Sequence, residues 1–347
     1  MTVGAAVAPT HKARAAEPLV ELRGLVVEYG VGDRLVRAVD GVDLAIAPGE
    51  ILGLAGESGC GKTTVANALM QVLPPAGRIA GGQVLFQGVD LTRKRREELR
   101  KFRWRNVSMV FQSAMNALNP VMRIGDQFVD MMRAHERISK RDALRRGGKL
   151  LELVGIDARR IRAYPHELSG GMRQRVIIAM ALALRPELVI MDEPTTALDV
   201  VVQREILQQV RTLQREWEFA VLFITHDLSL LVEFAHRIAI MYAGEVVEEA
   251  SARDLYGEPR HPYTVGLMRS FPPLHGPLLR MEGIPGQPPD LAAPPAGCRF
   301  HPRCPYCRPE DALLYARQTS ERPELRDVAP AHRVACHLVE EQGRERE

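Results

Sequence analysis

Residues 51–63 read ILGLAGESGCGKT, an apolar stretch that runs into a glycine-rich turn ending in lysine and threonine. The TVANALMQVL that follows at 64–73 has helical spacing. Between a strand and a helix, G-x-x-x-x-G-K-T is typical of a phosphate-binding loop, because glycines let backbone N–H groups converge on a phosphate. A plain glycine turn with a surface lysine is the alternative, which the flanking patterns argue against. The loop residues expected to bind nucleotide are Gly56, Ser58, Gly59, Cys60, Gly61, Lys62, Thr63 and Thr64.

A second apolar stretch, LVIMDE at 188–193, ends in two acidic residues. A buried parallel strand delivers its last residues into the crevice where ligands bind. We expect Asp192 to hold magnesium together with Thr63, and Glu193 to polarise an attacking water. Many strands end in an acid, so the stretch indicates a site only because a phosphate loop precedes it. Lys62 of that loop is expected to contact the β- and γ-phosphates.

Composition and charge exclude several classes of protein. The 347 residues are 46% apolar and 26% charged, as in an ordinary globular protein, and a net charge of +3 is too small to indicate nucleic-acid binding. The longest uncharged apolar run, 176–184, is about half of a membrane span. Residues 1–17 contain no long apolar segment and are expected to form a flexible arm, not a signal peptide. We therefore expect a cytoplasmic protein that reaches a membrane only through a partner.

The stretch RKRREELRKFRWR at 93–105 is strongly basic. A solvated helix face is the favoured interpretation, since no aromatic or glycine pattern supports the alternative of a nucleic-acid patch.

Strand and helix patterns alternate along the chain. Residues 18–55 alternate like strands, and 113–168 favour helices, with a candidate capping box SKRD at 139–142. From 169 onward helices alternate with the apolar strands LVIMD, AVLFIT and IAIMY, a pattern that predicts a parallel sheet covered on both faces. The composition shifts towards proline and glycine near residue 258. The expected units are a flexible arm (1–17), a main domain (18–257), a smaller C-terminal domain (258–337) and a frayed tail (338–347).

Residues 168–175 read LSGGMRQR and open the helical pattern VIIAMALAL. Ser169, Gly170 and Gly171 offer a hydroxyl and backbone donors at a helix N-terminus, either as a second anion site or as an ordinary cap. Lying between a phosphate loop and an acidic strand, this segment makes the chain resemble an ABC-transporter ATP-binding subunit. The resemblance implies an α/β fold: an ABC-type P-loop ATPase with a parallel-sheet core, an antiparallel N-terminal β subdomain, a helical subdomain at about 113–168 and a small C-terminal extension.

The resemblance also implies that two subunits share each ATP. In that family the signature of one subunit closes over the ATP held by the phosphate loop of the other. Ser169, Gly170 and Gly171 are thus implied to bind ATP held by a partner, and Asp199, in ALD at 197–199, to lie in the loop that reaches across the dimer.

Further family positions can be matched one by one. Tyr29 resembles the aromatic residue that stacks on adenine, with a core tyrosine as the alternative. Gln112 resembles the glutamine that senses magnesium and water, with a loop glutamine as the alternative, and His226 in FITHD resembles the histidine that contacts the γ-phosphate. Glu193, His226 and Gln112 are therefore implied to be catalytic in ATP hydrolysis. Magnesium is implied to lie near Thr63, Gln112 and Asp192.

The end of the chain points to one transporter class. HPYTVGLM, IPGQPPD, GCRFHPRCP and HRVACH resemble the C-terminal part of ATP-binding subunits of the oligopeptide/dipeptide (peptide/nickel) permeases, specifically the partner with GMRQR in its signature. The resemblance implies a second homologous ATP-binding subunit, two transmembrane permease subunits, an extracellular solute-binding protein and no nucleic acid. It places the chain at the cytoplasmic face of the membrane. FQSAMNALNP leaves peptide, nickel and oligosaccharide open as solutes, and a nucleic-acid or translation ATPase and an Fe–S redox module are the alternative functions.

Four cysteines cluster near the end: Cys298, Cys304, Cys307 and Cys336. In a cytosolic protein such a cluster favours metal or redox chemistry over structural disulfides. A [4Fe–4S] cluster, as inferred for some relatives, is the first hypothesis. Structural zinc with help from His301, His332 or His337, unliganded buried thiols, and a redox pair in CPYC are the alternatives.

Cys60 lies inside the phosphate loop. It is either a small neutral filler or a reactive thiol, because the helix dipole and Lys62 are expected to lower its pKa.

Overall fold

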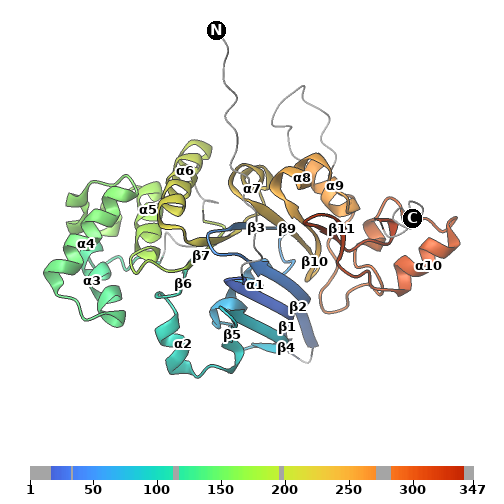
Figure 1. Cartoon of the computed structure of the whole chain (residues 1–347), viewed down its shortest axis with the longest axis horizontal. Coiled ribbons are helices and arrows are strands. Elements are labelled where there is room, and N and C mark those ends of the chain that lie inside the picture. Colours follow the sequence, from blue (N-terminus) through green and yellow to red (C-terminus); the bar gives the residue numbers. More distant parts are fainter. Residues whose placement is uncertain (1–16, 33, 112–116, 195–198, 271–282, 340–347) are drawn as a thin grey trace, which may run out of the picture.

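The structure, a computed structural model, describes residues 17–339 apart from 33, 112–116, 195–198 and 271–282 (Figure 1). Within this part, two β-sheets and the helices around them form the α/β architecture that the sequence predicts. None of the described helices is long and apolar enough to span a membrane.

The smaller sheet is antiparallel and is built from N-terminal residues. Its strand order is β2-β1-β4-β5, with β1 at Val20–Val31, β2 at Arg34–Ile46, β4 at Gly77–Phe86 and β5 at Val89–Asp90. Buried and partly or fully exposed residues alternate along the second half of β2, which is why this segment reads as a strand. This sheet confirms the expected antiparallel β subdomain, and β2 carries Ala38 to the edge of the candidate site.

The larger sheet has eight strands in the order β11-β12-β10-β9-β3-β8-β7-β6. The five from β9 to β6 are parallel, and β10, β12 and β11 continue the sheet in antiparallel fashion. The bounds are Ile51–Ala55 (β3), Val107–Val110 (β6), Leu188–Asp192 (β7), Ala220–Ile224 (β8), Arg237–Tyr242 (β9), Glu245–Ser251 (β10), Arg326–Ala329 (β11) and His332–Val334 (β12). Since the carboxyl ends of parallel strands meet at one edge, the segments after β3, β7 and β8 come together there.

Helices cover both faces of the larger sheet (Figure 1). Helix α1 (Lys62–Met70) lies between the two sheets, where Val65, Ala66 and Leu69 are buried among side chains from both. Five helices pack on the other face: α5 (Gly170–Ala181), α6 (Val200–Trp217), α7 (Leu228–Phe234), α8 (Ala252–Gly257) and α9 (Pro262–Arg269). Every residue of β3, β7 and β8 is buried between these layers, which accounts for their continuous apolar sequences.

A helical region connects β6 to β7. It contains α3 (Ile124–His135), α4 (Lys140–Leu153), and the 3₁₀ turns η3 (Ala158–Arg162) and η4 (Pro165–Glu167). The Ser139 hydroxyl caps α4 by accepting the N–H of Asp142 at 3.1 Å, as SKRD predicts. The helices approach closely at a glycine, because a Cβ on Gly125 would lie 2.8 Å from the carbonyl oxygen of Ile161.

The C-terminal residues extend the larger sheet. Strand β12 pairs with β10, and the 3₁₀ turn η5 (His301–Arg303) and helix α10 (Ala312–Ser320) belong to the same region. The fully buried Glu248 of β10 accepts hydrogen bonds from His332 Nε2 at 2.7 Å and from the N–H groups of Arg260 and His261. One buried carboxylate therefore joins β10, β12 and the start of α9.

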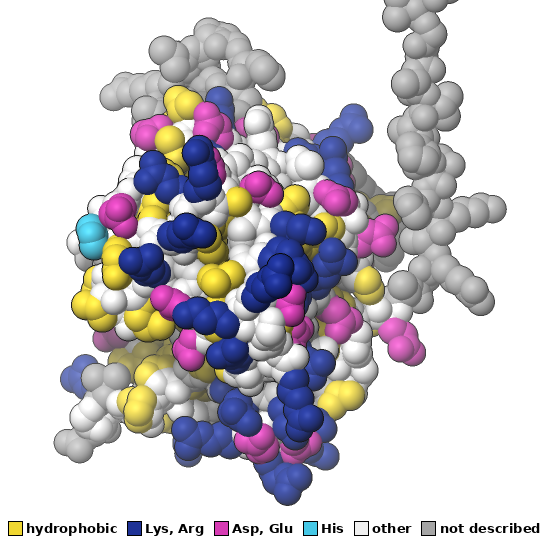
Figure 2. Space-filling model, turned by 90° about the vertical axis from the view of Figure 1, so that its left-hand side faces the viewer, with side chains coloured by type: hydrophobic (Ala, Val, Ile, Leu, Met, Phe, Trp, Pro, Cys, Tyr) yellow, Lys and Arg dark blue, Asp and Glu magenta, His cyan; other side chains and the backbone are white. Residues whose placement is uncertain are grey.

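The basic stretch forms a solvated helix with acidic partners. Helix α2 (Arg96–Phe102) buries none of its residues, and Lys94 and Arg100 pair with Glu98 and Glu97 at 3.1 and 3.0 Å. Figure 2 shows Lys and Arg side chains spread over the left-hand face of Figure 1 with Asp and Glu among them. The favoured interpretation of a solvated face is confirmed for α2.

Candidate functional site

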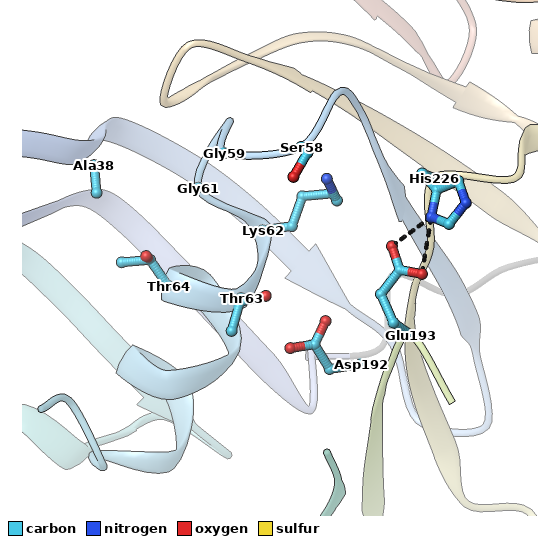
Figure 3. Close-up of a pocket in the computed structure, with 10 residues that line it drawn as sticks. All are labelled: Ala38, Ser58, Gly59, Gly61, Lys62, Thr63, Thr64, Asp192, Glu193 and His226. Carbon is cyan, nitrogen blue, oxygen red and sulfur yellow. Dashed lines mark hydrogen bonds and ion pairs between the residues drawn. The ribbon is translucent and has the colours of Figure 1, made fainter. Parts of the chain in front are cut away.

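A cleft of about 460 Å³ opens at the carboxyl edge of the parallel strands (Figure 3). It is bounded by the loop after β3, the ends of β7 and β8, and one residue of β2. The lining residues are Ala38, Ser58, Gly59, Gly61, Lys62, Thr63, Thr64, Asp192, Glu193 and His226. Phosphate loop and acidic strand, 125 or more residues apart in sequence, thus meet as predicted.

The phosphate loop has a backbone that only glycine can adopt at two positions. Gly56 and Gly61 have φ angles of +147° and +107°. A Cβ on Gly56 would lie 2.1 Å from the carbonyl oxygen of Met241, and one on Gly61 would lie 2.3 Å from that of Ala38. The loop is therefore pressed against the ends of β9 and β2. The sequence did not single out Ala38, because a small residue in a strand carries no signal of a site.

Lys62 bends back over the loop. Its ammonium group donates to the carbonyl oxygens of Gly56 and Glu57 at 2.8 and 2.9 Å, and the side chain is buried. The positive charge is thereby held at the mouth of the loop, above the N-terminus of α1. Charge and helix end together form an anion site.

Asp192 ends β7 and offers a buried oxygen to a cation. Asp192 is 1% exposed, and its Oδ1 has no hydrogen-bond partner within the described part of the chain. Burial raises the pKa of this carboxyl, the neighbouring Glu193 raises it further, and a hydrogen bond with the Thr63 side chain opposes the rise. A carboxylate oxygen that accepts no hydrogen bond, together with a neighbouring threonine hydroxyl, is a set of oxygen ligands that fits Mg²⁺.

Glu193 and His226 form a pair that the sequence did not predict. The Nδ1 atom of His226 lies 2.8 and 2.9 Å from the two carboxylate oxygens of Glu193 (Figure 3). Glu193 has a φ of +49°, which is uncommon for a residue with a side chain and marks local strain. Its backbone N–H is held by the carbonyl oxygen of Ile224 at 2.9 Å. The strained backbone aims the carboxylate into the cleft.

Tyr29 and Gln112 are two further residues that the sequence predicts for this site. Tyr29 is partly buried beside the cleft, with its hydroxyl 3.4 Å from the Thr64 hydroxyl and its ring against Gly77. Gln112 lies outside the described residues.

The signature residues are not part of this cleft. Ser169 is exposed and caps α5 by accepting the N–H of Met172 at 3.3 Å, with Gly170 and Gly171 in the first turn. Asp199 caps α6 through the N–H groups of Val201 and Val202. None of these four is among the described residues that line the cleft.

The expectation of a lowered pKa at Cys60 was wrong. The residue is 5% exposed, and burial raises the pKa of its thiol more than the nearby Lys62 ammonium lowers it. Desolvation of the thiolate therefore outweighs the electrostatic attraction.

The four C-terminal cysteines lie in one region but do not form a ready metal site. Cys336 is buried and Cys298 partly buried, and burial raises the pKa of each to about 12. Cys304 adds a smaller contribution to both, and Cys336 adds one to Cys298. Cys307 follows in a turn, where its N–H donates to the carbonyl oxygen of Cys304 at 3.2 Å. Across the described residues, no three Cys, His, Asp or Glu side chains are placed to hold one metal ion.

Two family models match the chain. Residues 39–196 match the model described as ABC transporter, and residues 247–310 match the C-terminal region of the oligopeptide/dipeptide transporter. The first match covers the phosphate loop, signature and acidic strand. The second covers the segment from β10 to beyond Cys307.

Curated relatives match over nearly the whole chain. The oligopeptide transport ATP-binding protein OppD of Bacillus subtilis is 41% identical over 325 residues, covering 92% of this chain and 89% of that protein. The dipeptide transport ATP-binding protein DppD of Haemophilus influenzae is 41% identical, covering 94% and 97%. A solved dimer of the ATP-binding cassette MJ0796 with ADP and Pi is 29% identical, with a TM-score of 0.61 over 67% of this chain and 99% of that one. The chain is therefore an ABC ATPase and belongs to the ABC-transporter ATP-binding proteins that carry the oligopeptide/dipeptide-transporter C-terminal region.

Proposed function

We propose that this chain powers the import of peptides through an ABC permease. The main support is that one chain contains both a cleft with a complete phosphate loop and acidic pair and a match to the oligopeptide/dipeptide-transporter C-terminal region. Relatives named for oligopeptide and dipeptide transport match over nine-tenths of the chain. Nickel and oligosaccharide are the alternative solutes. Neither the family models nor the relatives support a nucleic-acid ATPase or an Fe–S redox module.

We infer the roles of the described site residues from their positions and from the family resemblance, and the role of Gln112 from the resemblance alone. Lys62 and the loop N–H groups bind the phosphates, and Tyr29 stacks on the adenine. Thr63, Asp192 and Gln112 would hold Mg²⁺, which would neutralise phosphate charge when bound. Glu193 accepts the proton of the attacking water, and His226, already bonded to Glu193, orients that carboxylate.

We propose a dimeric machine with membrane partners. The signature residues Ser169, Gly170 and Gly171 and the loop residue Asp199 bind or reach ATP held by a second, homologous ATP-binding subunit. Their position outside this chain's own cleft supports that arrangement. Two transmembrane permease subunits and an extracellular solute-binding protein complete the importer, with this chain at the cytoplasmic face of the membrane. ATP binding closes the dimer, and hydrolysis with phosphate release reopens it.

We infer that any metal group of the C-terminal region is bound by the four cysteines, as a [4Fe–4S] cluster or, alternatively, as zinc. Cys304 and Cys336 contribute to the raised pKa of Cys298, and Cys307 to that of Cys304, which supports this because such contributions come from neighbouring thiols. In the arrangement of the described residues these thiols do not fit a metal ion. Iron, sulfide and zinc analysis after anaerobic purification distinguishes the two groups from free thiols.

Isolation of the native complex tests the proposed function. A tag on this chain is expected to recover a second ATP-binding subunit, two membrane subunits and a solute-binding protein from detergent-solubilised membranes. In proteoliposomes the complex is expected to take up labelled oligopeptide with ATP, and not after Glu193→Gln. Recovery without membrane subunits would contradict the proposal, and uptake of nickel or an oligosaccharide in place of peptide would reassign the solute.

A further inference from the structure

The C-terminal region reaches the phosphate loop through one arginine. Arg303, which ends η5 and precedes Cys304, faces the carboxylate of Glu57. Its Nη1 donates to Oε2 at 2.7 Å and its Nη2 to Oε1 at 3.0 Å, a bidentate pair that joins residues 246 positions apart. Only 6% of the Arg303 side chain is exposed, against 25% of the Glu57 side chain, so water reaches the pair mainly from the carboxylate side.

Arg303 is itself held in place by its surroundings. Its Nε donates to the carbonyl oxygen of Pro285 at 2.8 Å, and its guanidinium carbon lies 5.8 Å from the centre of the Tyr242 ring. Tyr242 in turn packs on Tyr263 and Phe300, with ring centres 4.6 and 5.2 Å away. The hydrogen bonds to Glu57 raise the pKa of Arg303, which keeps the guanidinium charged. The arginine is therefore a fixed charge supported by an aromatic cluster.

Glu57 follows the first glycine of the phosphate loop and is fixed at three points. Its N–H donates to the hydroxyl of the fully buried Tyr263 at 2.9 Å. Its carbonyl oxygen accepts from Lys62 Nζ at 2.9 Å, and its carboxylate is bound by Arg303. The loop needs such support because glycine can adopt many backbone conformations. The positive φ angles that the loop glycines adopt here represent only a few of them.

A second arginine of the same segment anchors the neighbouring backbone. Arg299 is buried, pairs with Asp40 and Glu245, and donates to the carbonyl oxygen of Ala243. The next residue, Gly244, donates to the carbonyl oxygen of Cys60 in the phosphate loop at 2.9 Å. The segment 298–304 thus supports the loop both directly, through Arg303, and through the turn between β9 and β10.

We propose that Arg303 is a positioning residue of the ATP site, which acts through Glu57 to hold the phosphate loop in the conformation that receives the nucleotide phosphates. A loop that is already ordered presents its N–H groups without reorganising. Where only a fraction of molecules has a competent loop, the apparent dissociation constant rises by the inverse of that fraction. Loss of Arg303 therefore weakens nucleotide binding and leaves turnover at saturating ATP largely intact.

The test compares nucleotide binding with turnover. MgADP affinity is measured calorimetrically on the full-length chain, and KM and kcat for ATP on the chain assembled with its transporter partners. Arg303→Ala is expected to raise Kd and KM about tenfold while kcat stays within about twofold. Arg303→Lys keeps the charge but loses the bidentate fork, so its values should lie between those of Arg303→Ala and wild type. The control Arg326→Ala removes an exposed arginine at the start of β11, which pairs with Glu324, and is expected to match wild type.

A double variant separates positioning from simple attachment of the C-terminal region. Glu57→Ala is expected to weaken MgADP binding by a similar factor. The double variant with Arg303→Ala and Glu57→Ala is expected to weaken it no more than either single variant, since both substitutions break the same interaction. Wild-type MgADP affinity in either folded single variant overturns the proposal. So does a double variant whose loss of MgADP affinity is the product of the two single losses. A lower kcat at unchanged KM overturns it as well. Should Arg303→Ala fail to fold, Glu57→Ala decides by the same measurements. The outcome does not depend on which solute is transported.

Discussion

Glu193 and His226 are adjacent in the cleft although 33 residues separate them in sequence. The carboxylate side chain is 11% exposed and the imidazole 61%, so the acid lies inside the cleft and the histidine at its opening. A general base must be within hydrogen-bond reach of the proton that it takes and must be held in one orientation. The imidazole, which contacts both carboxylate oxygens, supplies that orientation.

Glu193→Gln is expected to bind MgATP with near wild-type affinity and to hydrolyse it about 10²–10⁴ times more slowly, because the amide cannot accept the proton of the attacking water. Phosphate release by the assembled complex and binding of a fluorescent ATP analogue check the two halves of the prediction. Glu233→Gln, at an exposed glutamate of α7, is the matched control. Turnover near the wild-type rate would remove Glu193 from the role of base.

Cys60 shows what a sequence motif leaves undetermined. The spacing of the phosphate loop places a thiol beside Lys62 and a helix N-terminus, and these two features alone predict a low pKa. Burial has the opposite effect on the pKa, and it depends on Gly56 and on the ends of β2 and β9 packing against the loop. The residues of the loop could therefore be predicted, and the reactivity of one of them could not.

Alkylation rates test this correction at the residue scale. Cys60 is expected to react with iodoacetamide far more slowly than the more accessible Cys307, because a buried thiol is both shielded and protonated. Mass spectrometry of timed samples at pH 8 measures both sites in one protein, and alkylation in denaturant gives the reference in which they react alike. Faster labelling at Cys60 would restore the first interpretation of a reactive loop thiol.

At the scale of elements, the sequence predicts those helices and strands that neighbouring residues determine. The SKRD capping box and the start of α4 after Ser139 follow from neighbouring residues. Strands β11 and β12 are short, and their sequences RDVA and HRV lack a run of alternating apolar residues. β12 forms a strand because it pairs with the edge of β10, and β11 because it pairs with β12, a cause that a local pattern cannot contain.

The packing of the helical region gives a prediction with a control in the same bundle. Gly125→Ala is expected to lower the free energy of unfolding by about 1–3 kcal/mol, because the new Cβ meets the Ile161 carbonyl at 2.8 Å. Gly148→Ala, whose Cβ meets only Ala158 at 3.5 Å, is expected to be neutral or to stabilise α4 by up to about 1 kcal/mol. Urea unfolding of both variants decides. Equal effects would mean that helix propensity, not interhelical distance, controls this region.

At the scale of the whole molecule, ion pairs between distant residues attach the C-terminal region to the ATPase core. Arg299 binds Asp40, and Arg303 binds Glu57, across more than 240 positions in each case. The sequence motifs identify this region as a unit of its own and say nothing of these contacts, since charge pairing at such separation leaves no periodic signal. The structure joins the cysteine-bearing segment directly to the phosphate loop.

The buried His261 makes the stability of this junction depend on pH. Its Nδ1 accepts the N–H of Tyr263 at the start of α9, and burial lowers the pKa of the imidazole to about 4, below its ordinary value of 6.5. Between pH 6.5 and 4 the unfolded chain therefore binds a proton that the folded chain does not. The contribution of His261 is fully present above pH 6.5 and is lost as the pH falls through this window, by up to about 3 kcal/mol.

His261→Asn isolates this effect, because asparagine caps a helix as well but does not titrate. Unfolding free energies measured from pH 7.5 to 4 should fall more steeply for wild type than for the variant. Comparing the two curves cancels the opposite trend from Glu245, whose pKa is raised to about 6 by burial and which therefore stabilises the fold as the pH falls from 6 to 4.5. His166→Asn, at an exposed histidine, should keep the wild-type slope. Parallel curves for wild type and His261→Asn would show that acid destabilises the protein at other groups.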